Sequence, residues 1–294
     1  MTVLGYTPDL WLAEITVGLV NGCFFALLSL GLAIIFGLLR VVNFAHGAFF
    51  LLGAYGAWSL ERIAGLGYWW SLLLAPFALG IIGCAIEVLL VRRLYRMDPL
   101  YSLLLTYGLA LVVTGIFTRF YGVAGQSYTT PYVLAGAWDL GFMELPIYRA
   151  WVIFAALTVC AATWIGLERT KIGALLRAST ESPKLVQTFG INVPRLVTLA
   201  FGVGVALAAL AGVLAAPLTQ ISPLMGDNII VTLFAVVVIG GMGSILGSIF
   251  TGILLGVVQS MTVVLYPSAS DVVIFAVMAA VLFVRPSGLF GRGQ

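Results

Sequence analysis

The polar residues that could take part in chemistry stand inside apolar stretches of this chain. Asn43 and His46 are three positions apart, which places them on one face of a helix, just after a break at residues 37–40. Their side chains could line a polar route, or could cap a broken helix by hydrogen-bonding the backbone groups that the break sets free. Asn21, in the preceding apolar stretch, could act in the same way. For all three the alternative is a buried side chain with an ordinary structural role, and the residues leave both interpretations open.

No arrangement typical of a catalytic or metal centre is present in the sequence. There is one histidine, and Cys23, Cys84 and Cys160 lie in apolar runs without the spacing of a disulfide framework or of metal ligands. The chain has no GxSxG turn, HExxH pair, CxxC pair or phosphate-binding loop. We therefore expect no catalytic residues, no metal site, no cofactor and no hydrolysis of ATP by the chain itself.

The composition restricts the class of protein. Of the 294 residues, 62% are hydrophobic and only 9% are charged, with a mean hydropathy of +1.15. A soluble domain has about 25% charged residues, so an ordinary cytoplasmic protein and a disordered chain are both excluded. A net charge of +3 also argues against a nucleic-acid-binding protein. We expect an all-α, polytopic transmembrane bundle that forms a single domain over residues 1–294. The N-terminus has no basic region or small-residue cleavage site, so we expect no cleaved signal peptide.

The lengths of the apolar stretches predict the number of crossings. A spanning helix needs about 20 apolar residues. Long stretches occupy residues 11–38, 68–91, 100–120, 149–168, 196–216 and 245–266. Shorter or glycine-interrupted ones occupy residues 42–60, 228–242 and 271–285. The sequence therefore predicts about eight or nine spanning helices, some short or broken, and segment 228–242 could instead be re-entrant.

Lysine and arginine in the loops predict the orientation, because positively charged loops stay cytoplasmic. The loops at residues 92–99 and 169–195 are both basic, and two crossings separate them, so both can be cytoplasmic. The segment 121–148 has no Lys or Arg and is predicted to be extracytoplasmic. Nine crossings would leave the C-terminus cytoplasmic and the N-terminus outside. Three further arginines fit the cytoplasmic side: Arg40, Arg285 and Arg292.

Carboxylates are rare inside the apolar stretches. Glu87 comes closest to the middle of one, and it can pair with Arg92, about one helical turn later, or extend toward the membrane interface. Glu14, Asp227 and Asp271 fall near predicted helix ends, where a solvated carboxylate costs little. A proton or sodium relay would be expected to place carboxylates in mid-membrane, so this distribution argues against an ion-coupled carrier.

Small residues recur at four-residue spacing in three of the predicted helices. Such stripes allow helix backbones to approach closely inside a membrane. The stripes could pack within one subunit or could form a seam against a second membrane subunit, and both interpretations stay open. Their members are Gly18, Gly22 and Ala26; Gly204, Ala208, Gly212 and Ala216; and Ser244, Ser248, Gly252, Gly256 and Ser260.

The basic loop at residues 169–195 is too long for a simple connector. It contains helix formers and an apolar set at Leu185, Val186 and Phe189, followed by Gly190, which predicts a helix stop. A short amphipathic helix in the cytoplasm is suited to docking a peripheral partner. The alternative is a helix that lies on the bilayer surface.

Three blocks of sequence carry a family resemblance. They are NGCFFALLSLGLAIIFGLLRVVNFAHGAFFLLGAY, TKIGALLRASTESPKLVQTFGINVPRLVTLAFGVGVALAALAGVL and AVVVIGGMGSILGSIFTGILLG. Together they span most of the chain in the family's order. The chain resembles the permease subunits of branched-chain amino-acid ABC importers, the LivH/LivM family, and is more similar to the LivH-like branch. Asn21, Asn43, His46 and Gly47 follow the family's pattern, and we assign them to a translocation path or to a broken-helix motif.

The resemblance implies the partners and the location. An importer of this kind has two permeases, which in this family are usually different chains, so we expect a heterodimer. It has two cytoplasmic ATPases, which bind ATP and Mg²⁺, and an extracytoplasmic substrate-binding protein. The location implied is a bacterial inner membrane. Relatives with similar motifs move urea, short amides or aromatic acids, and the chain does not decide among these substrates. An ion-coupled carrier or a membrane enzyme would need ligands or a nucleophile that are lacking.

The resemblance also assigns a segment that couples transport to the ATPase. This coupling segment carries over onto Arg177, Ala178, Glu181, Gly190, Ile191 and Asn192. Two positions depart from the family pattern: Pro183, and Val186, where relatives commonly have Ala. Because proline disfavours helical geometry in the residue before it, here Ser182, the helix is predicted to start after Pro183, with Pro183 at or near its first turn.

Overall fold

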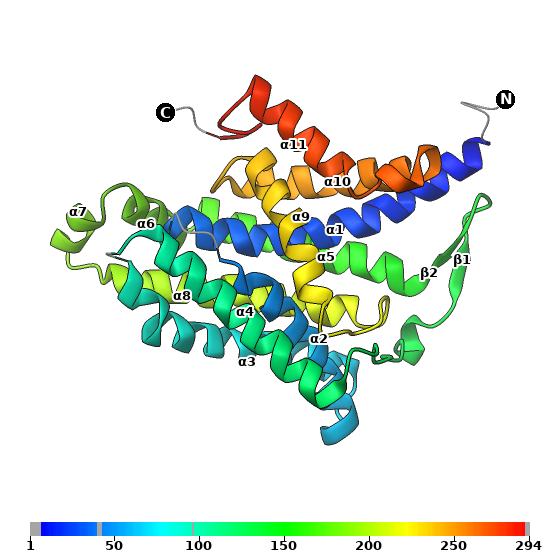
Figure 1. Ribbon diagram of the computed structural model, residues 1–294, viewed down its shortest axis with the longest axis horizontal. Coiled ribbons are helices and arrows are strands. Elements are labelled where there is room, and N and C mark those ends of the chain that lie inside the picture. Colours follow the sequence, from blue (N-terminus) through cyan, green and yellow to red (C-terminus); the bar gives the residue numbers. More distant parts are fainter. Residues whose placement is uncertain (1–6, 40–42, 96, 292–294) are drawn as a thin grey trace. The chain divides into compact units, whose positions relative to one another are not determined.

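The computed structural model describes residues 7–39, 43–95 and 97–291 (Figure 1). These residues fall into two compact units. Unit 1 holds the described residues of Met1–Ser29, Thr130–Cys160 and Thr232–Gln294, and unit 2 holds those of Leu30–Thr129 and Ala161–Val231. Helices α1 (Pro8–Leu39), α5 (Ile147–Arg169) and α9 (Met225–Gly240) contribute residues to both units. Arg40 and Arg292, which entered the prediction of orientation, lie outside the described residues, as does position 96.

The remaining elements of unit 2 are almost entirely helical. They are α2 (Ala45–Ala64), α3 (Tyr68–Leu89), the 3-10 turn η1 (Val91–Leu94), α4 (Pro99–Tyr121), α6 (Lys171–Glu181), α7 (Pro183–Thr188) and α8 (Val193–Ala215). The residues at several helix ends explain why the helices begin or stop there. Asp98 accepts a hydrogen bond from the amide of Leu100 ahead of Pro99 at the start of α4, and Gly65 ends α2 in a left-handed conformation.

Unit 1 contains the long helix α10 (Ile245–Leu265), the short helix α11 (Val273–Val284) and the 3-10 turns η2 (Tyr132–Leu134) and η3 (Pro267–Ala269). It also contains a small antiparallel hairpin of β1 (Ala137–Asp139) and β2 (Glu144–Pro146), in which Trp138 pairs with Leu145. Asp139 accepts a hydrogen bond from the amide of Gly141 at 2.7 Å, and Gly141 has φ +81, which shapes the hairpin turn. The sequence reasoning did not foresee this hairpin within segment 121–148.

Six helices among the described residues are long and apolar enough to cross a membrane: Pro8–Gly37, Tyr68–Leu94, Pro99–Tyr121, Ile147–Arg169, Val193–Ala215 and Ile245–Leu265. They coincide with the six long stretches predicted from the sequence, so the all-α multi-helix architecture is confirmed. The three shorter predicted segments form α2, α9 and α11, which have 20, 16 and 12 residues. The two most buried spans are in α1 and α8, at 78% and 67%, whereas the span in α5 is only 17% buried and suits contact with lipid.

Helix α8 is the centre of unit 2, and its small residues explain why. A Cβ on Gly204 would lie 2.8 Å from the carbonyl oxygen of Gly31 in α1, and one on Gly212 would lie 2.8 Å from the amide nitrogen of Ala54 in α2. Ala208 between them is fully buried. The stripe of Gly204, Ala208 and Gly212 therefore lies where backbones of the same chain approach too closely for larger side chains.

In unit 1, α1 and α10 approach in the same way. A Cβ on Gly252 would lie 2.5 Å from the amide nitrogen of Ala26, and one on Gly256 would lie 2.6 Å from the carbonyl oxygen of Gly18. Ser248 is buried, and its carbonyl oxygen accepts a hydrogen bond of 3.2 Å from the Ser29 hydroxyl. Ser244 caps the start of α10 by accepting from the amide of Gly247. This second stripe is thus used within the chain as well.

Candidate functional site

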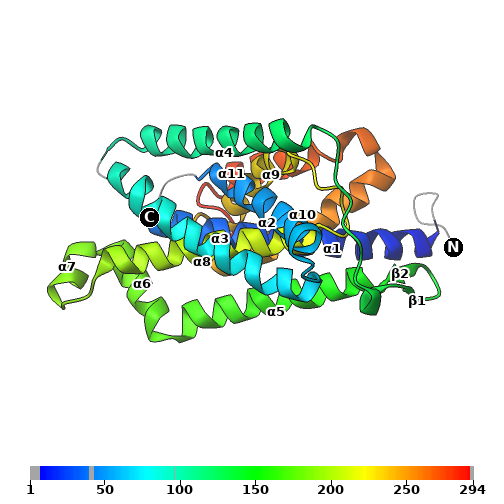
Figure 2. The same cartoon turned by 90° about the horizontal axis from the view of Figure 1, so that it is seen from below.

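The long basic loop folds into two short helices, α6 and α7, which lead into α8 (Figure 2). Thr170 begins α6 as its N-cap, accepting a hydrogen bond of 3.3 Å from the amide of Gly173. Gly173 lies against the backbone of Leu167, where a Cβ would overlap the carbonyl group. The close approach lets the chain turn sharply from the end of α5 into α6.

Arg177 turns back toward α5. Its guanidinium donates a hydrogen bond to the carbonyl oxygen of Leu167 and forms an ion pair of 3.3 Å with Glu168. Both side chains of the ion pair are about two-fifths exposed, so the pair itself contributes less than about 1 kcal/mol. Within the chain, Arg177 therefore fixes the direction of α6 relative to the end of α5.

Helix α7 begins and ends close to where its sequence predicts. Ser182 has φ −141 and ψ 75, outside the helical region, and Pro183 is the first residue of α7. Gly190, just after the helix, has φ +78, and its amide donates a hydrogen bond of 3.0 Å to the carbonyl oxygen of Gln187. The place of Pro183 in the first turn and the stop at Gly190 are confirmed, and the helix starts at Pro183 itself rather than after it.

One residue of the predicted apolar set fastens α7 to α8. Val186 is buried against Val193 and Val197 in the first turns of α8, and Ile191 packs on the same cluster. The other two members face outward, because Leu185 is 60% exposed and Phe189 is 73% exposed. Helix α7 and the residue that follows it thus pack on α8 with one face and expose apolar side chains on another.

Asn192 links the predicted coupling segment to α8 as the N-cap of that helix, accepting a hydrogen bond of 3.1 Å from the amide of Arg195. The side chains of Arg177 and Ile191 are partly buried. The other four predicted coupling residues are exposed at the surface of the chain: Ala178, Glu181, Gly190 and Asn192.

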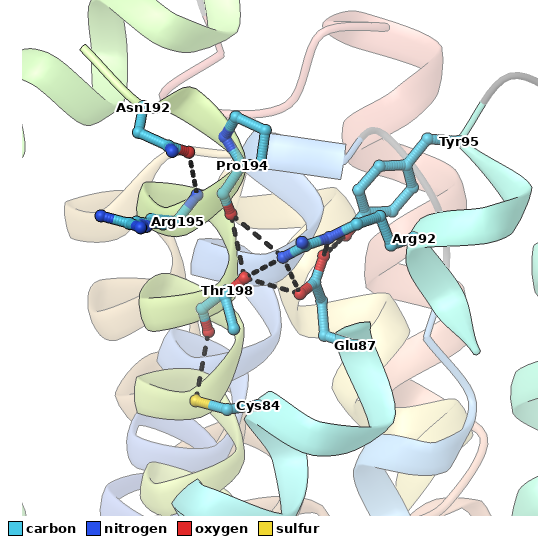
Figure 3. A network of polar contacts seen from close by, with 8 residues as sticks. All are labelled: Cys84, Glu87, Arg92, Tyr95, Asn192, Pro194, Arg195 and Thr198. Carbon is cyan, nitrogen blue, oxygen red and sulfur yellow. Dashed lines mark hydrogen bonds and ion pairs between the residues drawn. The ribbon is translucent and has the colours of Figure 1, made fainter. Parts of the chain in front are cut away.

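A network of polar side chains joins the end of α3 to the start of α8 (Figure 3). Arg92 in η1 forms a two-pronged ion pair with Glu87 of α3, with distances of 3.1 Å from Nε to Oε1 and 2.8 Å from Nη2 to Oε2. The hydroxyls of Tyr95 and of Thr198 in α8 each lie 2.7 Å from a Glu87 oxygen. Arg92 also donates to the Thr198 hydroxyl, and at 3.4 Å to the carbonyl of Pro194. We call Glu87, Arg92, Tyr95 and Thr198 the Glu87 cluster.

The buried carboxylate of Glu87 is balanced by the guanidinium of Arg92 and by hydroxyl donors. The Glu87 side chain is 0% exposed, whereas that of Arg92 is 34% exposed. Burial and the hydrogen bond to Glu87 raise the pKa of the Tyr95 hydroxyl, so this hydroxyl is protonated and donates at neutral pH. The predicted pairing of Glu87 with Arg92 is present, but sequence reasoning missed Thr198. Thr198 is distant from Glu87 in the chain, and only its polarity within the apolar stretch 196–216 could have drawn notice.

The residues of the predicted translocation motif belong to different units. Asn21 lies in unit 1, in the middle of α1, and is exposed. Asn43, His46 and Gly47 lie together in unit 2, at the start of α2. The Asn43 Oδ1 accepts a hydrogen bond of 3.1 Å from the amide of Ala45, whereas its buried Nδ2 has no partner within the described ranges.

His46 and Gly47 are both fitted into close helix contacts. His46 is fully buried, and a Cβ on Gly31 of α1 would lie 3.0 Å from its Cε1 atom. Gly47 lies against Gly226 at the start of α9, backbone to backbone. The geometry therefore suits the holding of a broken helix at these positions. The part of the chain that the structure describes holds no group of three or more His, Cys, Asp or Glu residues able to bind a metal ion.

Comparison with known proteins supplies the family. The sequence profile of the family described as "Branched-chain amino acid transport system / permease component" matches residues 15–282. The chain belongs to this permease family. No solved structure is matched by the chain.

The permease is similar to named proteins over almost its whole length. The high-affinity branched-chain amino acid transport system permease protein LivH of Escherichia coli (strain K12) is 28% identical, over 94% of each chain. The corresponding protein BraD of Pseudomonas aeruginosa is 29% identical, over 97% of each chain. The permease protein LivM of Salmonella typhimurium is 27% identical, over 90% of this permease and 67% of LivM.

Proposed function

We propose that this permease is a membrane subunit of an ATP-driven ABC importer that carries branched-chain amino acids into the cytoplasm. The family match over residues 15–282 is the observation that carries the proposal. The arrangement of α6 and α7 supports it, because a short two-helix segment with exposed apolar side chains suits the docking of a peripheral protein. ATP would be bound and hydrolysed by two separate ATPase subunits on the side of these helices.

The proposed topology has eight or nine crossings in a bacterial inner membrane, with the C-terminus in the cytoplasm. The six long apolar helices supply most of them, and α2, α9 and α11 supply the short or broken ones. Segment 121–148, which includes the β1–β2 hairpin, would then be extracytoplasmic and would help to receive a loaded substrate-binding protein. The similarity to both LivH and LivM supports a second, different permease chain as the partner.

Asn21 is proposed to face the translocation path or the second permease. An amide that faces hydrocarbon without a hydrogen-bond partner costs several kcal/mol, so an exposed Asn in the middle of α1 suits a polar surface rather than lipid. We propose that Asn43, His46 and Gly47 hold the broken helix at the start of α2.

Replacing Asn21 by leucine is expected to lower leucine uptake about fivefold without reducing the amount of assembled permease. The reason is that a hydrogen bond from the Asn21 amide to the passing substrate would contribute about 1 kcal/mol. Uptake of radiolabelled leucine per assembled complex measures the effect. Asn21→Gln, which keeps the amide, should retain most of the leucine uptake. Full uptake by Asn21→Leu would remove this residue from the path.

Replacing Gly190 by alanine is expected to uncouple transport. Alanine at φ +78 costs about 1 kcal/mol, so the turn between α7 and α8 relaxes and the coupling segment shifts. We expect uptake per ATP hydrolysed to fall about fivefold while hydrolysis continues. Gly65 is the matched control, because it also follows a helix at positive φ and has open space where a Cβ would stand. Equal ratios in Gly190→Ala, Gly65→Ala and the unmodified importer would refute the coupling assignment.

The proposed function is tested by transport in proteoliposomes. The permease is reconstituted with its second permease and ATPases, and the binding protein is loaded with radiolabelled leucine. Accumulation that requires ATP, and that excess isoleucine or valine suppresses, would support the proposal. Accumulation driven by a sodium or proton gradient without ATP would overturn it. Suppression by urea or by an aromatic acid, and not by isoleucine, would overturn the substrate class alone.

A further inference from the structure

Glu87 connects two helices at the end of unit 2 where the coupling segment joins α8. Its carboxylate accepts three hydrogen bonds from its own side of the junction, two from Arg92 and one from Tyr95, and a fourth from Thr198 across it. Because hydrogen bonds to a charged group are directional and strong, about 1.5–3 kcal/mol each, they fix the position of one helix along the other.

The same turns of α8 also hold the coupling segment. Val186 of α7 is buried against Val193 and Val197, and Thr198 follows Val197 directly. Asn192 caps the first turn, close to the carbonyl of Pro194 that accepts from Arg92. A displacement of α7 therefore reaches Thr198 through one short, continuous stretch of helix, and reaches α3 through Thr198.

The remaining contact between α3 and α8 does not need a charge. Gly80 of α3 lies against Gly202, and Gly83 lies against Val205, so the helices already pack by close approach of small residues. Replacing a buried ion pair by apolar side chains of similar size is often neutral or stabilising, so stability alone does not call for a charged carboxylate here. None of these glycine contacts involves a charged group, whereas the Glu87 cluster ties the ends of the two helices together through a buried carboxylate.

We infer that the Glu87 cluster is a positioning element, which makes α3 move together with α8 when the ATPases displace the coupling segment. The inference rests on the proposed function. Thr198 is the residue through which the coupling segment acts on α3.

The test removes the bridging hydroxyl and little else. In the complete importer, Thr198→Val keeps the shape of the side chain and leaves Glu87 with Arg92 and Tyr95. Thr198→Ser is the conservative variant that restores the hydroxyl. Thr262→Val is the matched control. The Thr262 hydroxyl lies 2.7 Å from the carbonyl oxygen four residues earlier, that of Val258, and the Thr198 hydroxyl likewise lies 2.9 Å from that of Pro194. The Thr262 hydroxyl, however, reaches no carboxylate among the described residues.

ATP hydrolysis and uptake of radiolabelled leucine are measured on the same proteoliposomes, after selection of assembled complexes by size. The expected result for Thr198→Val is a fall of about fivefold in leucine taken up per ATP hydrolysed. Thr198→Ser and Thr262→Val should keep the ratio of the unmodified importer. If Thr198 had only a structural role, its substitution would change the yield of complex but not the amount of leucine taken up per ATP hydrolysed.

An unchanged ratio in Thr198→Val would overturn the inference, as would an equal fall in Thr262→Val. If Thr198→Val yields too little complex, the smaller Thr198→Ala takes its place, and a fall in its ratio supports the inference while an unchanged ratio overturns it. Failure of the proposed function is recognised separately, because the unmodified importer would then show no ATP-dependent leucine uptake at all.

Discussion

An Arg92→Met permease is expected to have a free energy of unfolding about 3 kcal/mol lower than that of the unmodified chain. The substitution leaves the Glu87 carboxylate buried, with hydroxyl donors from Tyr95 and Thr198 but without the guanidinium that balances its charge. Removing one partner of a buried pair typically costs about 3–5 kcal/mol, and the lower end applies because the Arg92 side chain is partly exposed. Reversible unfolding in detergent, followed by circular dichroism, measures the difference.

The neighbouring cation provides the control for this experiment. Arg93 is also in η1, and the structure shows no ion pair for it with any described residue. Arg93→Met should therefore change the free energy of unfolding by less than about 0.5 kcal/mol. Equal destabilisation by the two substitutions would mean that the cost comes from the loss of positive charge at the membrane interface and not from Glu87.

Gly256→Ala is expected to destabilise the permease by about 2 kcal/mol, since overpacking of a close contact costs about 1–3 kcal/mol. A Cβ at this position would overlap the backbone of Gly22 and would lie 2.6 Å from the carbonyl oxygen of Gly18. Backbone atoms cannot rotate away, so α1 and α10 would have to separate along their contact. The loss is measured as a lower unfolding free energy in the same detergent assay.

Gly108→Ala is the control, and it is expected to raise the free energy of unfolding rather than lower it. Gly108 lies within α4 and has no described atom within 4 Å of the place where a Cβ would stand. Alanine in an unobstructed helix is favoured over glycine by up to about 1 kcal/mol, so this variant should be slightly more stable. If Gly256→Ala were as stable as Gly108→Ala, the close packing of α1 on α10 would be contradicted.

The apolar stretches were the most predictable part of the fold. The stretches 68–91, 100–120 and 245–266 match α3, α4 and α10 closely, because a helix in lipid must be apolar for the whole thickness of the membrane. The ends of α7 were also predictable, since Pro183 and Gly190 act through backbone geometry that depends only on their own side chains.

Contacts between distant segments were not predictable from one sequence. The pattern of Leu185, Val186 and Phe189 indicated a helix with an apolar face, but only the fold determines that Val186 packs on α8 while the other two face outward. Likewise, the spacing of Glu87 and Arg92 predicted their pairing because it is local, whereas Thr198 reaches Glu87 from another helix. Tertiary packing decides which polar group meets which charge.

Copurification shows whether the permease works as part of an ABC importer. The permease is extracted in mild detergent from its native membrane, and every protein that accompanies it is identified by mass spectrometry. We expect a second permease of the same family together with one or two ATPase subunits. A permease that is isolated alone and still transports leucine after reconstitution, without any ATPase, would not be part of an ABC importer.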